Sequence, residues 1–318
     1  MKTTWLNTLT GTLVLLGMAS APLQAQPTAA ASNLAHPESV ASDGKFLYVT
    51  NIGAQADALA ADGDGSVARL ALDGRLLARN LAAVPLHSPK GTALVGHVLY
   101  VADLHRLIGL DPNTGQQVYL LDFSSAGVKM LNDLAVKDDS TLFATATDTG
   151  QVFEVALGRR PRFAALAVPA IAGANGLCYD RARQRLYVAG SGSFAAARGE
   201  GRVGYIDWAA GQPRYHTLGA ATGFFDGVAL LGPDHLLVSD WVNLAQPQGV
   251  LRQVNVATGE TTVLGEKTFG GPADFLVTEN RQALLVPAMQ TGELLRVPLP
   301  PRPKPAASGK AQTFKTKQ

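Results

Sequence analysis

The chain has 318 residues, of which 47% are hydrophobic and 16% charged, and its formal net charge is +2. This is enough apolar material for a large core in one or two domains. Six of its basic residues lie near the two ends, so residues 26–299 have a net charge of about −4. A body of that charge disfavours nucleic-acid binding, and we expect no nucleic-acid partner.

Residues 1–25 have the features of a cleaved signal peptide. Lys2 supplies a positive charge, residues 13–19 form a short apolar run, and small residues suitable for cleavage follow. The run is too short to span a bilayer, so we expect no membrane span after cleavage, and an uncleaved anchor is the alternative. The chain has one cysteine, Cys178, and therefore no internal disulfide. A large exported protein without disulfides fits a bacterial periplasm.

A two-strand pattern recurs six times within residues 26–299, roughly every 40 to 50 residues. Each copy has a turn with a polar residue, a short apolar strand, and a second strand ending in a triplet such as Leu47-Tyr48-Val49. Two more strands follow in each copy, with hairpin signals such as Asp73-Gly74 between them. Four strands per unit of this length predict an all-β fold, a six-bladed β-propeller with four-stranded blades.

The ends of the repeat region indicate how the ring closes. The sixth copy stops one strand short, so we expect residues 28–36 to supply the outer strand of the last blade. Residues 300–318 are rich in Pro, Lys, Ser and Gly and are predicted to be a disordered basic tail. Three long loops, residues 52–65, 191–201 and 241–249, are expected to form a rim on one face.

The polar residue that begins each copy is the main functional signal. First strands line the central channel of a propeller, so six side chains should converge on the axis: Glu38, Lys90, Asn132, Asn175, Asp226 and Asp274. The plain alternative is that wet channel mouths tolerate polar residues. Two carboxylates and two amides of this set suit Ca²⁺, which takes six to eight oxygen ligands: Glu38, Asn132, Asn175 and Asp226. The ring has no His or Cys, which argues against structural zinc.

Residues 35–299 resemble the senescence-marker-protein/gluconolactonase family, the regucalcin-like six-bladed propellers related to paraoxonases and diisopropylfluorophosphatase. In that family a Glu of the first blade, Asn residues of the third and fourth, and an Asp of the fifth hold a divalent metal. The resemblance implies these roles for Glu38, Asn132, Asn175 and Asp226. It also implies a metal-dependent hydrolase of lactones or related esters, of the gluconolactonase type, acting on a small-molecule substrate. Asp226 would double as general base, and Asp274 is a second catalytic candidate.

Lys90 departs from the family pattern, because a cation near Ca²⁺ is repelled unless a carboxylate neutralises it. We expect Lys90 to pair with Asp274 or Glu38, or to bind an anionic group of the substrate.

Further substrate contacts are expected from residues on the loop face. Asp103 and Asp240 close second strands on this face, and Trp241 follows Asp240. Phe194, Phe224, Phe225 and Trp241 are candidates for an apolar wall, with ordinary packing as the favoured alternative for each of them taken singly. The competing hypothesis is a non-catalytic propeller that binds a small molecule or a protein partner, since propellers serve both uses. We expect the protein to be a monomer.

Overall fold

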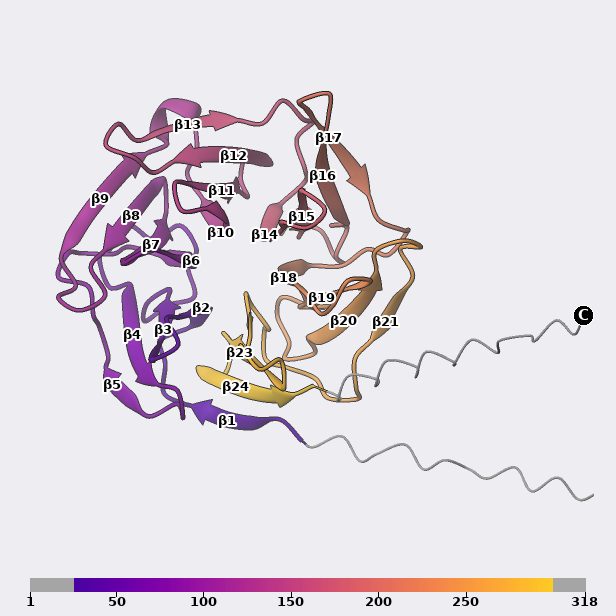
Figure 1. Cartoon of the computed structure of the whole chain (residues 1–318). Helices are drawn as coiled ribbons and strands as arrows, with labels where there is room; N and C mark the ends of the chain where they lie inside the picture. Colours follow the sequence, from indigo (N-terminus) through magenta and orange to yellow (C-terminus); the bar gives the residue numbers. More distant parts are fainter. Residues whose placement is uncertain (1–25, 300–318) are drawn as a thin grey trace, which may run out of the picture.

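The computed structural model describes residues 26–299, so the predicted leader and tail lie outside the described residues. Six four-stranded antiparallel sheets surround a central axis (Figure 1). This arrangement confirms the predicted six-bladed β-propeller. Helical structure in residues 26–299 amounts to one 3-10 turn, Ser124–Ala126. None of the described helices has the length and apolar character to cross a membrane.

The first five blades each consist of four consecutive strands, numbered from the axis outward. They are β2 (Pro37–Ser42), β3 (Phe46–Asn51), β4 (Ser66–Ala71) and β5 (Leu76–Ala78); β6 (Pro89–Val95), β7 (Val98–Asp103), β8 (Arg106–Leu110) and β9 (Gln117–Asp122); β10 (Leu131–Asp138), β11 (Thr141–Ala146), β12 (Gln151–Ala156) and β13 (Arg162–Ala165); β14 (Ala174–Asp180), β15 (Arg185–Gly190), β16 (Val203–Ala209) and β17 (Gln212–Thr217); β18 (Phe225–Leu230), β19 (His235–Asp240), β20 (Val250–Asn255) and β21 (Thr261–Val263).

The sixth blade joins the two ends of the described chain. It contains β22 (Leu276–Val277), β23 (Ala283–Ala288), β24 (Glu293–Pro298) and the N-terminal strand β1 (Thr28–Ala31). β1 pairs antiparallel with β24, with Thr28 opposite Arg296. Figure 1 shows these two strands side by side. The prediction that an early segment completes the last blade is therefore confirmed.

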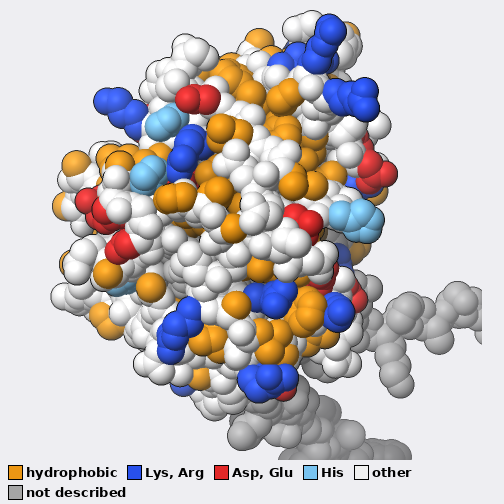
Figure 2. Space-filling view, turned by 90° about the vertical axis from the view of Figure 1, so that its left-hand side faces the viewer, with side chains coloured by type: hydrophobic (Ala, Val, Ile, Leu, Met, Phe, Trp, Pro, Cys, Tyr) orange, Lys and Arg blue, Asp and Glu red, His pale blue; other side chains and the backbone are white. Residues whose placement is uncertain are grey.

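The core lies between neighbouring blades. The recurring triplet sits in the second strand of each blade, which is covered on both faces, and Leu47, Tyr48 and Val49 are all buried. Such a strand is apolar throughout because neither face meets water. The outer strands carry several of the exposed hydrophobic residues, for example Val118 on β9, and others lie in loops. Figure 2 shows one side of the propeller, where hydrophobic, basic and acidic side chains are interspersed.

Candidate metal centre and substrate cavity

The inner strands converge on a cavity of about 150 Å³ at the end of the channel where these strands begin. Five predicted ring residues line it, and each is the second residue of a first strand, β2, β6, β10, β14 or β18: Glu38, Lys90, Asn132, Asn175 and Asp226. All five are buried, between 2% and 6% exposed. The structure therefore brings together five of the six side chains that the repeat predicts at the axis.

A recurring irregularity aims these side chains at the axis. In each of the first five blades the pairing between first and second strand shifts register just after the strand begins. The residue before each ring residue is paired in register, for example Pro37 with Asn51 and Phe225 with Asp240. The ring residue itself falls in the shifted part. A shift of this kind bends the strand and re-aims its side chains, which accounts for the common direction of the ring.

The sixth ring position is Ala273, and the prediction of Asp274 for it was wrong. The pairing equivalent to Pro37 with Asn51 is Pro272 with Ala288, so the residue that follows, Ala273, takes the ring position. Asp274 lies one residue deeper and does not line the cavity. Its Oδ2 accepts a hydrogen bond of 2.7 Å from Ser39 Oγ.

Buried hydroxyls in alternate blades repeat the same pattern and confirm this assignment. Thr50 Oγ1 donates to Lys90 O, and Thr145 Oγ1 donates to Asn175 O, each the ring residue of the next blade. Ser239 Oγ makes the equivalent bond to Ala273 O at 3.0 Å. These three bonds fix the backbone of ring residues against the neighbouring blade.

Three buried oxygens in the cavity have no hydrogen-bond partner within residues 26–299. They are Glu38 Oε2, Asn175 Oδ1 and Asp226 Oδ1, and all three belong to predicted metal ligands. The fourth predicted ligand, Asn132, donates from Nδ2 to Thr147 Oγ1 at 2.8 Å, which orients its amide. Buried acceptors without donors are costly, and a divalent cation that prefers oxygen would satisfy them.

The ligand set consists of two carboxylates and two amides. No cluster of three or more His, Cys, Asp or Glu side chains suited to a metal occurs in the described part of the chain. The two amide ligands are therefore essential to the metal hypothesis. The residues present fit a divalent cation that accepts neutral oxygen donors.

The carboxylates at and just below the cavity are buried, and burial and their mutual repulsion raise their pKa values. Burial raises the pKa of Glu38 well above its ordinary value, and the charges of Asp226 and Asp274 raise it further. Burial and then the charge of Asp274 raise the pKa of Asp226 to about 7, although the hydrogen bond from Trp241 acts in the opposite direction. Burial also raises the pKa of Asp274 to about 6. A bound cation would relieve this excess of negative charge.

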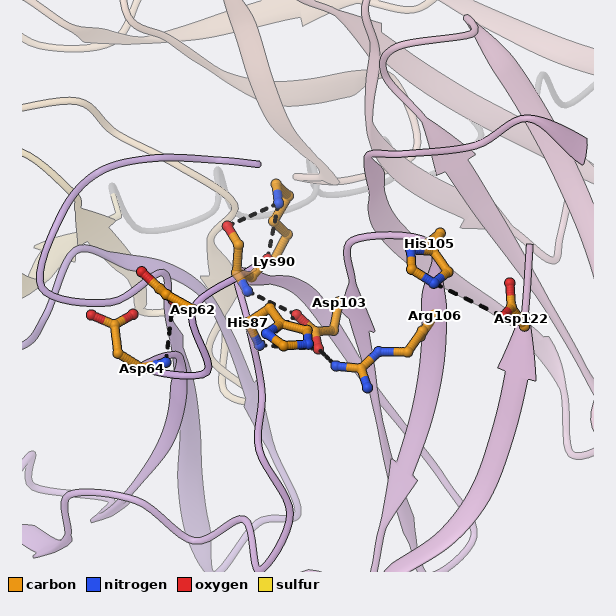
Figure 3. A network of polar contacts seen from close by, with 9 residues as sticks. Asp62, Asp64, His87, Lys90, Asp103, His105, Arg106 and Asp122 are labelled. Atoms are coloured by element: carbon orange, nitrogen blue, oxygen red, sulfur yellow. Dashed lines mark hydrogen bonds and ion pairs between the residues drawn. The ribbon is translucent and has the colours of Figure 1, made fainter. Parts of the chain in front are cut away.

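Lys90 does not form the expected ion pair. Its Nζ donates to Ala58 O at 2.7 Å, to Ser88 O at 2.9 Å and to Ser88 Oγ at 3.2 Å. Figure 3 shows Lys90 beside His87 and Asp103. None of the ion pairs within residues 26–299 includes Lys90. Burial lowers the pKa of Lys90 to about 8, while the charge of Glu38 opposes this shift. An ammonium has three hydrogens, and all three of them have protein acceptors here. Lys90 therefore ties the loop after β3 to the entrance of β6.

Asp103 and Asp240 support the site from the ends of the second strands β7 and β19, in place of the expected contact with substrate. Neither lines the cavity, and both are almost completely buried. Asp103 accepts hydrogen bonds from the backbone N–H groups of His87 and Ser88 and pairs with Arg106, as Figure 3 shows.

Asp240 acts in the same way in the fifth blade. It accepts from Phe224 N at 3.1 Å and Val242 N at 2.9 Å, and it pairs with Arg252 at 2.7 Å. Ser88 and Phe224 each lie two residues before a ring residue. Both aspartates therefore hold the backbone that leads into the ring.

The aromatic wall is present, in place of the ordinary packing that was favoured for each residue singly. Phe194, Phe224, Phe225 and Trp241 all line the cavity. Trp241 also donates from Nε1 to Asp226 Oδ2 at 2.9 Å, so it is both wall and hydrogen-bond donor. The three long loops form the rim, since each contributes lining residues, for example Ile52, Ser191 and Leu244. Met130 and Met289 complete the wall and were not singled out from the sequence.

A second layer below the ring was also missed. It contains Asp133, whose two oxygens accept from Leu134 N at 2.7 Å and Leu177 N at 2.6 Å. Glycines occupy this layer in three blades, and a Cβ on Gly176 would lie 2.1 Å from Asp226 O. Small residues are required here because inner strands of adjacent blades approach closely. The sequence signal was the small or acidic residue that follows each ring residue.

No protein-family sequence model matches the chain, and no curated protein matches it by sequence. Solved structures do match it in three dimensions. A gluconolactonase from Xanthomonas campestris is 16% identical, with a TM-score of 0.63 over 86% of this chain and 89% of that one. A luciferin-regenerating enzyme is 14% identical, with a TM-score of 0.59 over 84% and 92%. A chain of the nidogen/laminin complex is 20% identical, with a TM-score of 0.52 over 73% and 79%.

These matches confirm the predicted resemblance at the level of the fold. At such low identity the likeness shows a shared fold alone, and the fold is compatible with enzymes and with binding modules. The function therefore has to be argued from the cavity.

Proposed function

We propose that this chain is an exported, metal-dependent hydrolase of lactones or related esters. The observation that supports this most is the set of three unpartnered, buried oxygens in one cavity, Glu38 Oε2, Asn175 Oδ1 and Asp226 Oδ1. The fold shared with a gluconolactonase is consistent with this reaction.

Four residues from four blades would hold the metal: Glu38, Asn132, Asn175 and Asp226. Carboxylate and amide oxygens favour Ca²⁺. When bound, such a cation polarises an ester carbonyl and promotes the ionisation of water. The protein contributes the positions of the four donors, because each is attached to a strand held between neighbouring blades.

Asp226 is the proposed general base. Trp241 donates to its Oδ2, so Oδ1 serves as the metal ligand and uses its second lone pair to accept a proton from the attacking water. The water oxygen bonds to the carbonyl carbon, the ring C–O bond breaks, and the proton is returned to the leaving oxygen. Asp274 does not line the cavity, so we do not propose that it takes part.

The aromatic wall and the rim loops keep bulk water from the reacting carbonyl. Phe224 and Phe225 are buried beside the ring, and Trp241 lines the cavity and donates to Asp226. A partly dry cavity strengthens the electrostatic contacts made at its floor.

The proposal is tested with purified protein of known metal content. Lactones and aryl esters are assayed before and after treatment with a chelator, and Ca²⁺ is then added back. We expect turnover that the chelator abolishes and Ca²⁺ restores. If metal-loaded protein turns over none of these substrates, the non-catalytic binding hypothesis replaces the hydrolase.

Export is proposed from residues 1–25 and is tested separately. The N-terminus of protein recovered from the periplasm of an expressing bacterium is expected to begin near residue 26. Periplasmic protein that retains Met1 would contradict the cleaved leader.

A further inference from the structure

The cavity wall above the ring is almost entirely apolar. Ten of the sixteen lining residues are apolar, and they include Ile52, Met130, Phe194, Leu244 and Met289. The six polar lining residues are the five ring residues and Ser191. A ligand in this cavity therefore meets polar side chains mainly at the floor.

Most of the polar side chains that line the cavity are already hydrogen-bonded within the protein or are proposed to bind the metal. Four of them are the proposed metal ligands, and Lys90 has an acceptor for each hydrogen of its ammonium group. Ser191 Oγ has backbone acceptors at Gly173 O and Gly192 O, at 3.2 and 3.3 Å. A polyhydroxylated ligand would lose its hydration and find few side-chain partners in return, and each buried hydroxyl without a partner is costly.

Exposed apolar residues also occur in the rim loops. Phe194 lines the cavity and is 47% exposed, while Leu59 and Val242, each next to a lining residue, are 53% and 39% exposed. These residues belong to three different rim loops. Single exposed hydrophobic residues are ordinary, but here each of the three loops that line the cavity carries one.

The backbone of Val242, in one of the rim loops, is strained. Its φ of 59° lies in the left-handed region, which a β-branched residue rarely adopts, and Asp240 Oδ1 holds its N–H at 2.9 Å. Strained backbone of this kind is concentrated at sites of function.

We infer that the substrate is a lactone or ester with an extended apolar substituent, and that a polyhydroxylated sugar lactone is a poor substrate. This rests on the proposed hydrolase function. The carbonyl lies at the ring, and the substituent follows the wall past Phe194 to the rim at Leu59 and Val242.

The first test compares γ-butyrolactone, γ-hexalactone, γ-octalactone and γ-decalactone with glucono-δ-lactone. Each added methylene that becomes buried should raise kcat/KM about 2- to 4-fold. The kcat/KM of glucono-δ-lactone should be well below that of γ-decalactone. If its kcat/KM equals or exceeds that of γ-octalactone, this inference is overturned while the hydrolase proposal stands.

Binding decides the matter if no substrate is turned over, an outcome that refutes the hydrolase proposal itself. Calorimetric titration at two temperatures should then show tighter binding of γ-decalactone than of glucono-δ-lactone, with a negative heat-capacity change. Equal or weaker binding of γ-decalactone overturns the apolar subsite.

Two leucines of similar exposure allow a controlled test of the rim, one in a rim loop and one on an outer strand. Leu59→Ala should lower the ratio of γ-decalactone to γ-butyrolactone kcat/KM at least threefold. Leu120→Ala removes a leucine of similar exposure, 48%, on the outer strand β9 and should leave this ratio unchanged. An unchanged ratio in Leu59→Ala, in protein that unfolds at the same temperature as wild type, would place the substituent elsewhere.

Discussion

Trp241 Nε1 lies 2.9 Å from Asp226 Oδ2, so a residue at the start of a rim loop directly holds a carboxylate of the ring. This bond leaves Oδ1 as the unpartnered oxygen of Asp226. The position of the rim loop and the orientation of the proposed general base are therefore linked. A change in either one will affect the other.

Trp241→Phe keeps the aromatic wall but removes this donor. Loss of a hydrogen bond to a buried carboxylate should cost about 1.5–3 kcal/mol, so we expect a 10- to 100-fold loss in kcat/KM or in Ca²⁺ affinity. Both are measured, by steady-state kinetics and by calorimetric titration with Ca²⁺. Trp208→Phe is the control, because Trp208 packs against Phe143 away from the cavity. If Trp241→Phe has the kcat/KM and the Ca²⁺ affinity of wild type, the hydrogen bond from Trp241 does not orient Asp226 for either role.

Asn175→Ala removes an amide oxygen that has no protein partner. We expect Ca²⁺ affinity to fall at least 100-fold, because one of only four protein ligands is lost. Asn113→Ala, in the exposed hairpin turn of the second blade, should bind Ca²⁺ as wild type does. Calcium affinity that survives the loss of Asn175 would mean that the ligand assignment is wrong.

Gly176→Ala tests the packing of the second layer. The new Cβ would lie 2.1 Å from Asp226 O, a backbone atom that cannot move without displacing β18. We expect a loss of about 1–3 kcal/mol or more in the free energy of unfolding, measured from the urea midpoint. Gly158→Ala should be nearly neutral, because nothing lies within 4 Å of its added Cβ. Equal midpoints for the two variants would contradict the close approach of β14 and β18.

Cys178 should be an unreactive thiol in the folded protein. Burial raises its pKa to about 12, whereas the ordinary value is 9.0. Since the thiolate is the nucleophile, alkylation by iodoacetamide at pH 8 should be roughly 1,000-fold slower than in urea-unfolded protein. The rate should rise about tenfold per pH unit above that.

The same shift has a defined effect on stability. A thiol whose folded pKa is raised contributes stability below pH 9, and this contribution is lost as the pH rises from about 9 toward 12. Rapid labelling of the folded protein at pH 8 would contradict both statements.

The repeat was sufficient to predict five of the six ring positions, because the apolar triplets align the second strands. It was not sufficient for the sixth. The distance from a ring residue to its triplet varies by a residue or two between blades, because the hairpins that join the first and second strands differ in length: Ala41 pairs with Tyr48, whereas Cys178 pairs with Tyr187. A one-residue difference between Ala273 and Asp274 therefore could not be detected without the pairing of Pro272 with Ala288.

The roles of Lys90, Asp103 and Asp240 depend on partners that are distant in the sequence or in the backbone. Lys90 is held by the carbonyl of Ala58, and a backbone acceptor has no sequence signature. Asp240 is neutralised by Arg252 on the next strand. Position on the loop face was predicted correctly for these residues, but the direction of each side chain was not.

The pairing of β1 with β24 has a consequence for how the protein folds. Thr28 and Arg296 stand at opposite ends of the described chain, so the ring cannot close until nearly all of it has been synthesised. Contacts of such large sequence separation slow folding. Until β1 docks, β24 presents an open edge to other chains, and aggregation competes with closure. Chaperone dependence during late synthesis, and sensitivity to short deletions within residues 26–31, follow from this one strand.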